Sequence, residues 1–141
     1  MNNINTSDFL FVYGLLQSNF NNPYADLLKN NAANLGKGYC FGRLYEIDGY
    51  PGLIIDEDSK DQVYGTIYQI KNQAIFSQLD LFEGIGERFS KPYQYMRIQI
   101  KCYQEMQDFS AWAYVYNWSV NGKKLILSGD YLEYSSQPEK D

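Results

Sequence analysis

Residues Met96-Arg97-Ile98-Gln99-Ile100-Lys101-Cys102-Tyr103 alternate between apolar and polar side chains at every step. Successive side chains of a β-strand point to opposite faces of a sheet. This period of two therefore predicts a strand with one face in the core and the other toward solvent. It is the clearest strand signal in the chain, and the fold is expected to be built on a sheet that contains it.

Five further segments are predicted to be strands, because they are rich in β-branched and aromatic residues or are bounded by turn residues. They cover residues 9–13, 39–47, 53–55, 63–70 and 109–116. The first is apolar throughout, which is typical of a strand buried on both faces. Gly42 indicates a bulge or a bend in the second. The pairs Asp48-Gly49, Pro51-Gly52 and Asn121-Gly122 are turn signals.

Two helices are predicted from capping residues and apolar spacing. Asn22-Pro23 opens the first, because proline is favoured at the first helical position, and Asn30-Asn31 with Gly36 is expected to end it. Asn72 is the expected N-cap of the second helix. The apolar face of that helix carries Ile75, Phe76, Leu79 and Phe82.

The composition is that of one folded domain. With 141 residues, 45% hydrophobic and 17% aromatic, the chain can bury a substantial core. About six strands with two or three short helices indicate an α+β domain with a curved or barrel-like sheet. The domain is expected to cover residues 9–134, between an N-terminal tail over 1–8 and a loose polar tail over 135–141.

The charge balance limits the partners. A net charge of −5 argues against nucleic acid or an anionic membrane, because both require a basic face. No stretch is long enough to cross a membrane. The first residues lack the basic region and the apolar run of a signal peptide. A cytoplasmic protein is therefore expected.

Two groups of residues leave alternatives open. Cys40 and Cys102 lie in apolar, strand-like surroundings, which is typical of cysteines buried as small hydrophobic residues; a disulfide is the alternative. The acidic run Asp56-Glu57-Asp58 is typical of a solvated turn, and a divalent-metal site is the alternative. The simpler interpretation is preferred for both, so no metal or cofactor is predicted.

Glu83 is the leading candidate for proton transfer. The chain contains no histidine, so such chemistry must use carboxylates, tyrosines, lysines or cysteines. Glu83 stands at the expected end of the second helix, where the partial negative charge of the helix disfavours a carboxylate. Burial there would raise its pKa toward neutrality. The alternative is a solvated acid at a helix end.

A second candidate feature is the corner Tyr13-Gly14-Leu15-Leu16, at the end of the first strand. Gly14 would let the backbone approach a ligand closely. Outward-pointing N–H groups after it would form a nest for a carboxylate or a developing oxyanion. Alternatively, Gly14 serves only a tight turn.

These two features, in this order, resemble motifs of the γ-glutamyl cyclotransferase-like family, which includes γ-glutamylamine cyclotransferase and AIG2-like proteins. The family motifs are Tyr-Gly-x-Leu near the start and Leu-Asp-x-x-Glu-Gly further on. Further matches follow in the family's order and extend the resemblance from about Phe9 to Tyr134. They are Tyr50-Pro51-Gly52-Leu53, Val63 to Tyr68, Tyr95-Met96-Arg97, Ala111 to Tyr116 and Ser128-Gly129-Asp130-Tyr131.

The resemblance implies a small mixed β-barrel of about six strands with two or three flanking helices. It also implies an enzyme that cyclises a γ-glutamyl amine or peptide to 5-oxoproline and releases the free amine. Glu83 matches the catalytic glutamate and would act as general acid and base. The N–H groups of Gly14, Leu15 and Leu16 would hold the α-carboxylate of the substrate. Tyr13 and Tyr95 would be cavity walls, with the Tyr95 hydroxyl donating to the substrate; strand packing is the alternative for Tyr95.

Leu15 departs from the family pattern, because many members carry Ser or Thr there. It favours a second interpretation, a non-catalytic binder of a small amino-acid-like metabolite in the same cavity. A third is a protein-interaction module with an exposed aromatic surface. Arg97 is expected on the polar face of its strand, and Trp112 and Trp118 in the core or at its rim. The partner would be a small γ-glutamyl compound, and the protein a monomer or a weak homo-oligomer.

Overall fold

Five strands form a closed barrel in the computed structural model, which describes residues 9–17 and 22–136. Their order is β2-β4-β1-β6-β5, and a pairing of β5 with β2 at Tyr39 and Tyr103 closes the ring. All of these pairings are antiparallel except that of β1 with β6, which is parallel. The predicted mixed barrel is therefore confirmed. Its strands are β1 (Phe9–Val12), β2 (Ala32–Ile47), β4 (Gln62–Ile70), β5 (Tyr95–Gln104) and β6 (Gln107–Tyr116).

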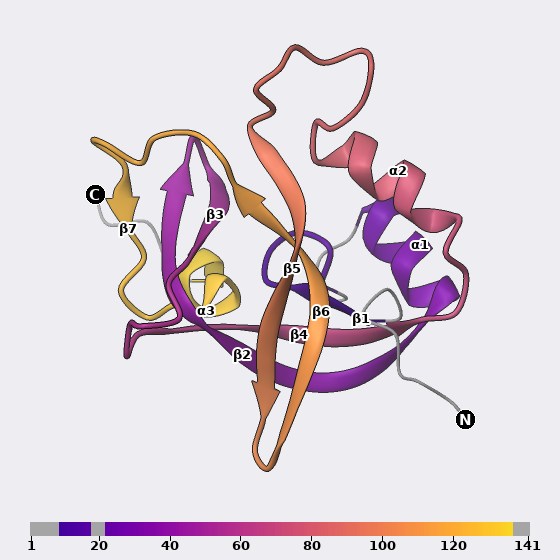
Figure 1. Ribbon diagram of the computed structural model, residues 1–141, viewed down its shortest axis with the longest axis horizontal. Coiled ribbons are helices and arrows are strands. Elements are labelled where there is room, and N and C mark those ends of the chain that lie inside the picture. Colours follow the sequence, from indigo (N-terminus) through magenta and orange to yellow (C-terminus); the bar gives the residue numbers. More distant parts are fainter. Residues whose placement is uncertain (1–8, 18–21, 137–141) are drawn as a thin grey trace.

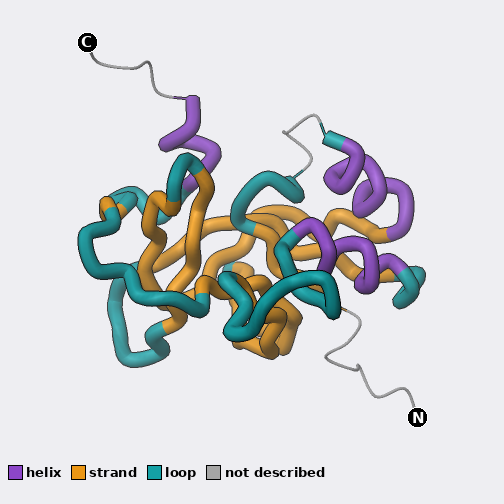
Figure 2. The backbone as a smooth tube through the Cα atoms, turned by 90° about the horizontal axis from the view of Figure 1, so that it is seen from above, coloured by secondary structure: helices purple, strands orange, loops and turns teal. Residues whose placement is uncertain are grey.

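Two short strands extend the barrel on one side, β3 (Tyr50–Ile55) and β7 (Lys124–Leu125), and both pair with the last part of β2. Three helices flank the strands. Helices α1 (Pro23–Asn31) and α2 (Ile75–Phe82) lie together on one side, and α3 (Tyr131–Ser136) lies on the opposite side (Figures 1 and 2). None of the described helices is long and apolar enough to cross a membrane.

Strand β1 separates two hydrophobic clusters. Phe9, Phe11 and Tyr13 enter the cluster inside the barrel, whereas Leu10 and Val12 enter the cluster beneath α1 and α2. All five side chains are buried. The continuous apolar run therefore forms a strand covered on both faces, as predicted.

The alternating strand β5 follows its pattern only in part. Ile100 and Cys102 are buried as predicted, but Ile98 is exposed. Met96, in the same phase, is half-buried, so the predicted alternation holds fully only in the second half of the strand.

Glycine and proline positions account for other differences from prediction. The bulge in β2 falls between Asn34 and Gly36, while Gly42 is where β2 leaves β4 and pairs with β3. Gly36 therefore lies within β2 and does not end α1. Pro51 and Gly52 lie inside β3, and the turn is made by Asp48 and Gly49.

The helix starts were predicted with mixed success. Asn22 is the N-cap of α1, and its Oδ1 accepts a hydrogen bond from the Ala25 N–H at 2.8 Å. Asn72 is not the N-cap of α2, because its side chain accepts from the Ala74 N–H in the turn before the helix, and Ala74 takes the cap position. At the chain end, Ser135 and Ser136 belong to α3 rather than to a loose tail. The predicted tail residues 1–8 and 137–141 lie outside the described residues.

Helix α2 ends in a Schellman motif, which sets the position of Glu83. The Ile85 N–H donates to the Asp80 carbonyl at 2.9 Å, and the Gly84 N–H donates to the Leu81 carbonyl at 3.2 Å. Gly84 has a φ of +80°, the left-handed conformation common just past a helix end. This turn stops the helix at Phe82 and leaves Glu83 as the C-cap.

Gly84→Ala is expected to lower the free energy of unfolding by about 1 kcal/mol, because alanine is strained at positive φ. A Cβ at this position would meet no atom within 4 Å, so the loss would be purely conformational. Gly84→Asn should lose less, because asparagine tolerates this backbone region. Urea unfolding of the three proteins measures the difference. Equal losses for Ala and Asn would contradict the conformational explanation.

Candidate active site

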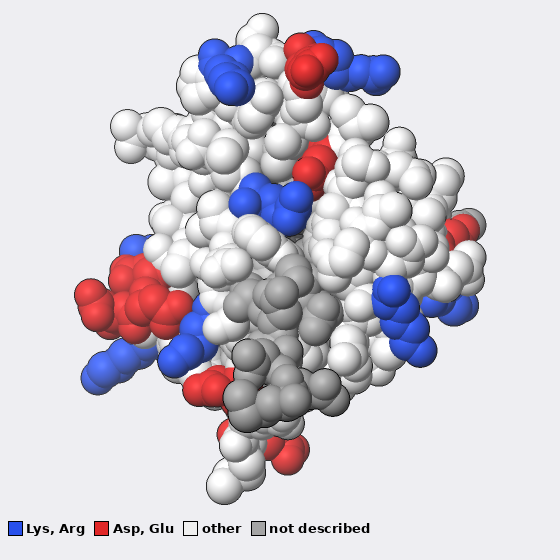
Figure 3. Space-filling model, turned by 45° about the vertical axis from the view of Figure 1, so that its right-hand side comes forward, with Lys and Arg blue, Asp and Glu red and all other residues white. Residues whose placement is uncertain are grey.

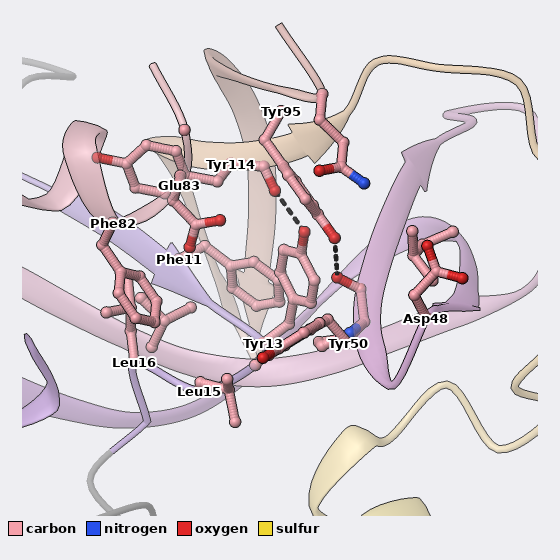
Figure 4. A pocket seen from close by; sticks show the side chains of 16 residues that line it. Phe11, Tyr13, Leu15, Leu16, Asp48, Tyr50, Phe82, Glu83, Tyr95 and Tyr114 are labelled. Atoms are coloured by element: carbon pink, nitrogen blue, oxygen red, sulfur yellow. Dashed lines mark hydrogen bonds between the residues drawn. The ribbon is translucent and has the colours of Figure 1, made fainter. Parts of the chain in front are cut away.

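A cavity of about 490 Å³ opens between the end of β1, the β2–β3 turn, the end of α2 and the start of β5 (Figure 4). All six residues predicted for the site line it: Tyr13, Gly14, Leu15, Leu16, Glu83 and Tyr95. Segments far apart in the sequence therefore meet here as the sequence motifs predicted. The wall also includes residues that had not been predicted, among them Phe11, Tyr50, Pro51, Phe82 and Tyr114.

Gly14 is needed because the chain passes close to β3. A Cβ on Gly14 would lie 2.7 Å from Cγ of Pro51, well inside van der Waals contact. The residue is not among those with positive φ. The close approach that the sequence predicted between Gly14 and a ligand is therefore made instead by Pro51 of β3, which also lines the cavity.

Two hydrogen bonds to carbonyl groups hold the loop after β1. The Leu15 carbonyl accepts from Nδ2 of Asn22 at 2.8 Å, and the Gln17 N–H donates to the Gly14 carbonyl at 3.1 Å. Within the described ranges, the N–H groups of Gly14, Leu15 and Leu16 donate to no protein acceptor. Free peptide donors at a cavity wall are suited to a carboxylate or an oxyanion. Asn22, the α1 cap, was not predicted as part of this arrangement.

Both predicted wall tyrosines have their hydroxyl protons engaged within the protein. Tyr13 donates to the Tyr114 carbonyl and accepts from the Leu53 N–H at 3.3 Å. Tyr95 donates to the Pro51 carbonyl at 2.9 Å. Tyr95 lines the cavity, but its hydroxyl proton is already used within the protein, so donation to a substrate stays a prediction that would require this bond to break. Burial first, and the nearby Glu83 second, raise the pKa of each tyrosine, so both stay neutral.

Glu83 reaches the cavity from the end of α2, and its carboxyl group points toward the aromatic wall (Figure 4). The residue keeps partial exposure because it faces the open space. Among the residues that the structure describes, no side chain pairs with its carboxyl group. Burial, with a smaller effect of the Asp80 carboxylate, raises the pKa of Glu83 to about 8. A carboxyl group with this pKa can both accept and donate a proton near neutral pH.

Comparison with known proteins decides the family. The family model described as γ-glutamyl cyclotransferase, AIG2-like, matches residues 10–133. The chain belongs to this family. The γ-glutamylcyclotransferase family protein YtfP of Escherichia coli K12 is 32% identical over 130 residues, which are 88% of this chain and 96% of that protein. The resemblance predicted from the motifs is confirmed.

Solved structures of similar proteins have the same fold as this AIG2-like chain. The solution structure of Escherichia coli ytfP has 31% identity and a TM-score of 0.63, covering 91% of this chain and 99% of that chain. Protein c4763 of uropathogenic Escherichia coli has a TM-score of 0.68 at 21% identity, with coverages of 94% and 98%. A mouse AIG2-like protein has a TM-score of 0.56 at 24% identity, with coverages of 79% and 77%. The last two likenesses concern the fold alone.

Other residues considered for function in this family member lie outside the cavity. Arg97 forms an ion pair with Asp80 on the side of α2, and Trp112 packs there partly buried. Trp118 is exposed. Of the segment Gly84–Pro92 that follows Glu83, only Gly84 lines the cavity, and the loop extends away from the barrel at the top of Figure 1.

The structure also shows the surroundings of the two cysteines and of the acidic run. Cys40 and Cys102 are free and buried inside the barrel, and burial raises the pKa of Cys102 to about 12. Asp56 pairs with Arg43 at 3.1 Å and accepts from the Asp58 N–H. In residues 9–17 and 22–136, no group of three or more suitable side chains could hold a metal ion. On the face seen in Figure 3, the Lys and Arg side chains stand apart from one another.

The raised pKa of Glu83 predicts a pH-dependent stability. The folded protein keeps this proton up to about pH 8, whereas the unfolded chain releases it near the ordinary value of 4.5. The stabilisation is complete below the lower value and is lost as the pH rises through the higher one. The Tm of Glu83→Gln should therefore exceed that of the wild type by a margin that grows, by about 3 °C or more, from pH 5 to pH 9.

Thermal unfolding across this pH range measures the margin. Glu87→Gln is the matched control, because Glu87 is an exposed acid in the following loop. Its Tm difference from the wild type should not change with pH. A constant difference for Glu83→Gln would contradict the raised pKa.

Proposed function

We propose that this protein is a γ-glutamyl cyclotransferase that converts a γ-glutamyl amine or peptide to 5-oxoproline and a free amine, with Glu83 as general base and then general acid. The observation that carries the proposal is the carboxyl group of Glu83. It lies in the cavity that Gly14, Leu15 and Leu16 also line, has a pKa of about 8, and within the described residues the N–H groups of those three residues have no acceptor. Family membership supports the reaction class.

The first step needs a base. The Glu83 carboxylate takes a proton from the substrate's α-ammonium group, and the resulting amine attacks the γ-carbonyl carbon of the same molecule. The peptide N–H groups after β1 would hold the α-carboxylate and so orient the chain for closure of the five-membered ring. Holding a flexible substrate in a reactive conformation lowers the entropic part of the barrier.

The second step needs an acid. The bond between the γ-carbon and the leaving nitrogen breaks as the protonated Glu83 donates its proton to that nitrogen. The regenerated carboxylate then takes the second proton of the ring nitrogen and passes it to the released amine, so the products are 5-oxoproline and the amine in its ammonium form. No redox change occurs, and the two protons that the former α-ammonium group loses both end on the leaving nitrogen. A group with a pKa near the working pH suits both directions of proton transfer.

The direct test is the release of 5-oxoproline from γ-glutamyl-ε-lysine, other γ-glutamyl amines and γ-glutamyl dipeptides, followed by mass spectrometry. The wild type should turn over at least one of these compounds. Glu83→Gln should reduce kcat/KM by at least about 100-fold, the usual contribution of a positioned acid or base. Glu87→Gln should keep wild-type activity. Equal turnover by the wild type and Glu83→Gln would exclude Glu83 from the mechanism.

Leu15 supports a second candidate, a non-catalytic binder of a small amino-acid-like metabolite. Its side chain lies at the cavity and packs partly buried against the barrel core, where a hydroxyl residue would offer a donor. For a binder, γ-glutamyl compounds would raise the Tm without product in long incubations. Leu15→Thr, which supplies the hydroxyl, would then be the variant in which to look for turnover. Turnover by the wild type would exclude this candidate.

A further inference from the structure

Asp80 lies one helical turn before Glu83 and is held by two side chains from the barrel wall. Arg97 of β5 donates from Nε to Oδ1 at 2.8 Å and from Nη2 to Oδ2 at 3.3 Å. The Tyr114 hydroxyl of β6 donates to Oδ1 at 2.6 Å. Three elements therefore meet at this carboxylate, with both of its oxygens engaged.

The Arg97 guanidinium is enclosed between two aromatic rings. Its central carbon lies 4.4 Å from the ring centre of Phe76 and 4.7 Å from that of Trp112. The Arg97 and Asp80 side chains are only 25% and 21% exposed. A two-pronged, partly desolvated pair of this kind is held more firmly than a surface ion pair. The guanidinium cannot be deprotonated at any working pH, so its charge is permanent.

Asp80 is joined to Glu83 in two ways. Residues three apart on a helix are neighbours, so the two carboxyl groups repel when both are charged. The Asp80 carbonyl also accepts hydrogen bonds from the N–H groups of Glu83 and Ile85, which form the turn that carries Glu83. A change at Asp80 thus reaches Glu83 through both charge and backbone.

The groups that face Glu83 from the adjoining elements are Asp80 on α2 and the hydroxyls of Tyr13, Tyr95 and Tyr114. The segment from β2 to β3 adds Asp48 and Tyr50 to the cavity lining, and Asp48 is paired with Lys123 at 3.7 Å. The three tyrosines that face Glu83 are neutral near pH 8, because burial raises the pKa of each. The described cavity lining includes no Lys or Arg. Arg97, on the outer side of Asp80, is therefore the cation that offsets the negative charge beside Glu83.

We infer that Arg97 is a positioning residue for Glu83: it neutralises Asp80 and holds the last turn of α2 against β5 and β6. Its effect on catalysis rests on the proposed function, whereas its effect on the protonation of Glu83 does not. Without the guanidinium, the charge of Asp80 acts on Glu83 uncompensated, and Glu83 keeps its proton to higher pH. Without the Asp80 carboxylate, the guanidinium acts alone, and Glu83 releases its proton at lower pH.

The experiment is a titration of Glu83 in the free protein by ¹³C NMR of its side-chain carboxyl group, assigned by the signal that Glu83→Gln removes. Arg97→Met should raise the pKa of Glu83 by about half a unit or more, and Asp80→Asn should lower it by a similar amount. Arg97→Lys, which keeps the charge, should remain close to the wild type. Lys101→Met is the matched control. It removes a positive charge from the same strand in an exposed pair with Asp108, and should leave the pKa unchanged.

Opposite shifts in Arg97→Met and Asp80→Asn are the sign of an electrostatic role, because loss of packing alone would not reverse direction between the two. If both shift the same way, or if neither shifts while circular dichroism shows them folded, the inference is overturned. Should Arg97→Met fail to fold, Arg97→Lys and Tyr114→Phe decide. Tyr114→Phe removes a donor from Asp80 and should raise the pKa of Glu83 slightly, and an unchanged or lower value would overturn the inference.

Activity assays on the same variants separate this inference from the proposed function. The rise of kcat/KM with pH should move to higher pH in Arg97→Met and to lower pH in Asp80→Asn, matching the NMR shifts. If no variant and no wild type forms 5-oxoproline while the NMR shifts are opposite, the proposed function fails and the role of Arg97 stands.

Discussion

The position of β1 is the constraint on which the rest of the structure depends. The strand has four residues, yet it pairs with β4 on one side and β6 on the other and supplies side chains to both hydrophobic clusters. A strand covered on both faces cannot slip by one residue without exchanging its two sets of apolar contacts. Its end is thereby fixed, and so are Tyr13 and the loop after it. The packing of β1 therefore sets the position of this part of the cavity wall.

Glu83 differs from two other partly buried carboxylates of the fold, Asp56 and Asp80. Asp56 and Asp80 each have an arginine partner, which repays part of the desolvation that burial costs. Glu83 faces the cavity with no such partner in the described part of the chain, and its pKa rises as a result. A protein gains no stability from this arrangement at neutral pH. Such unfavourable placements are concentrated at functional sites, where the shifted proton affinity is useful.

The sequence predicted features that depend on local backbone chemistry, and it missed those that depend on distant contacts. The run at β1 and the cap at Asn22 follow from residue type and neighbours. The order of the family motifs predicted that Gly14 and Glu83 line one cavity, because related sequences share one topology. The engagement of the Tyr95 hydroxyl by Pro51, however, depends on β3, 44 residues away. No local pattern encodes it.

Three tyrosines near Glu83 have their hydroxyl groups engaged within the protein. Tyr13, Tyr95 and Tyr114 each donate their hydroxyl proton to a protein oxygen. They therefore present neutral aromatic surface to the cavity and do not compete for protons near neutral pH. Of the two carboxyl groups that line the described cavity, those of Asp48 and Glu83, the Glu83 group at the end of α2 is the one whose pKa burial raises to about 8. In a chain without histidine, burial has moved a glutamate to the proton affinity at which imidazole usually serves.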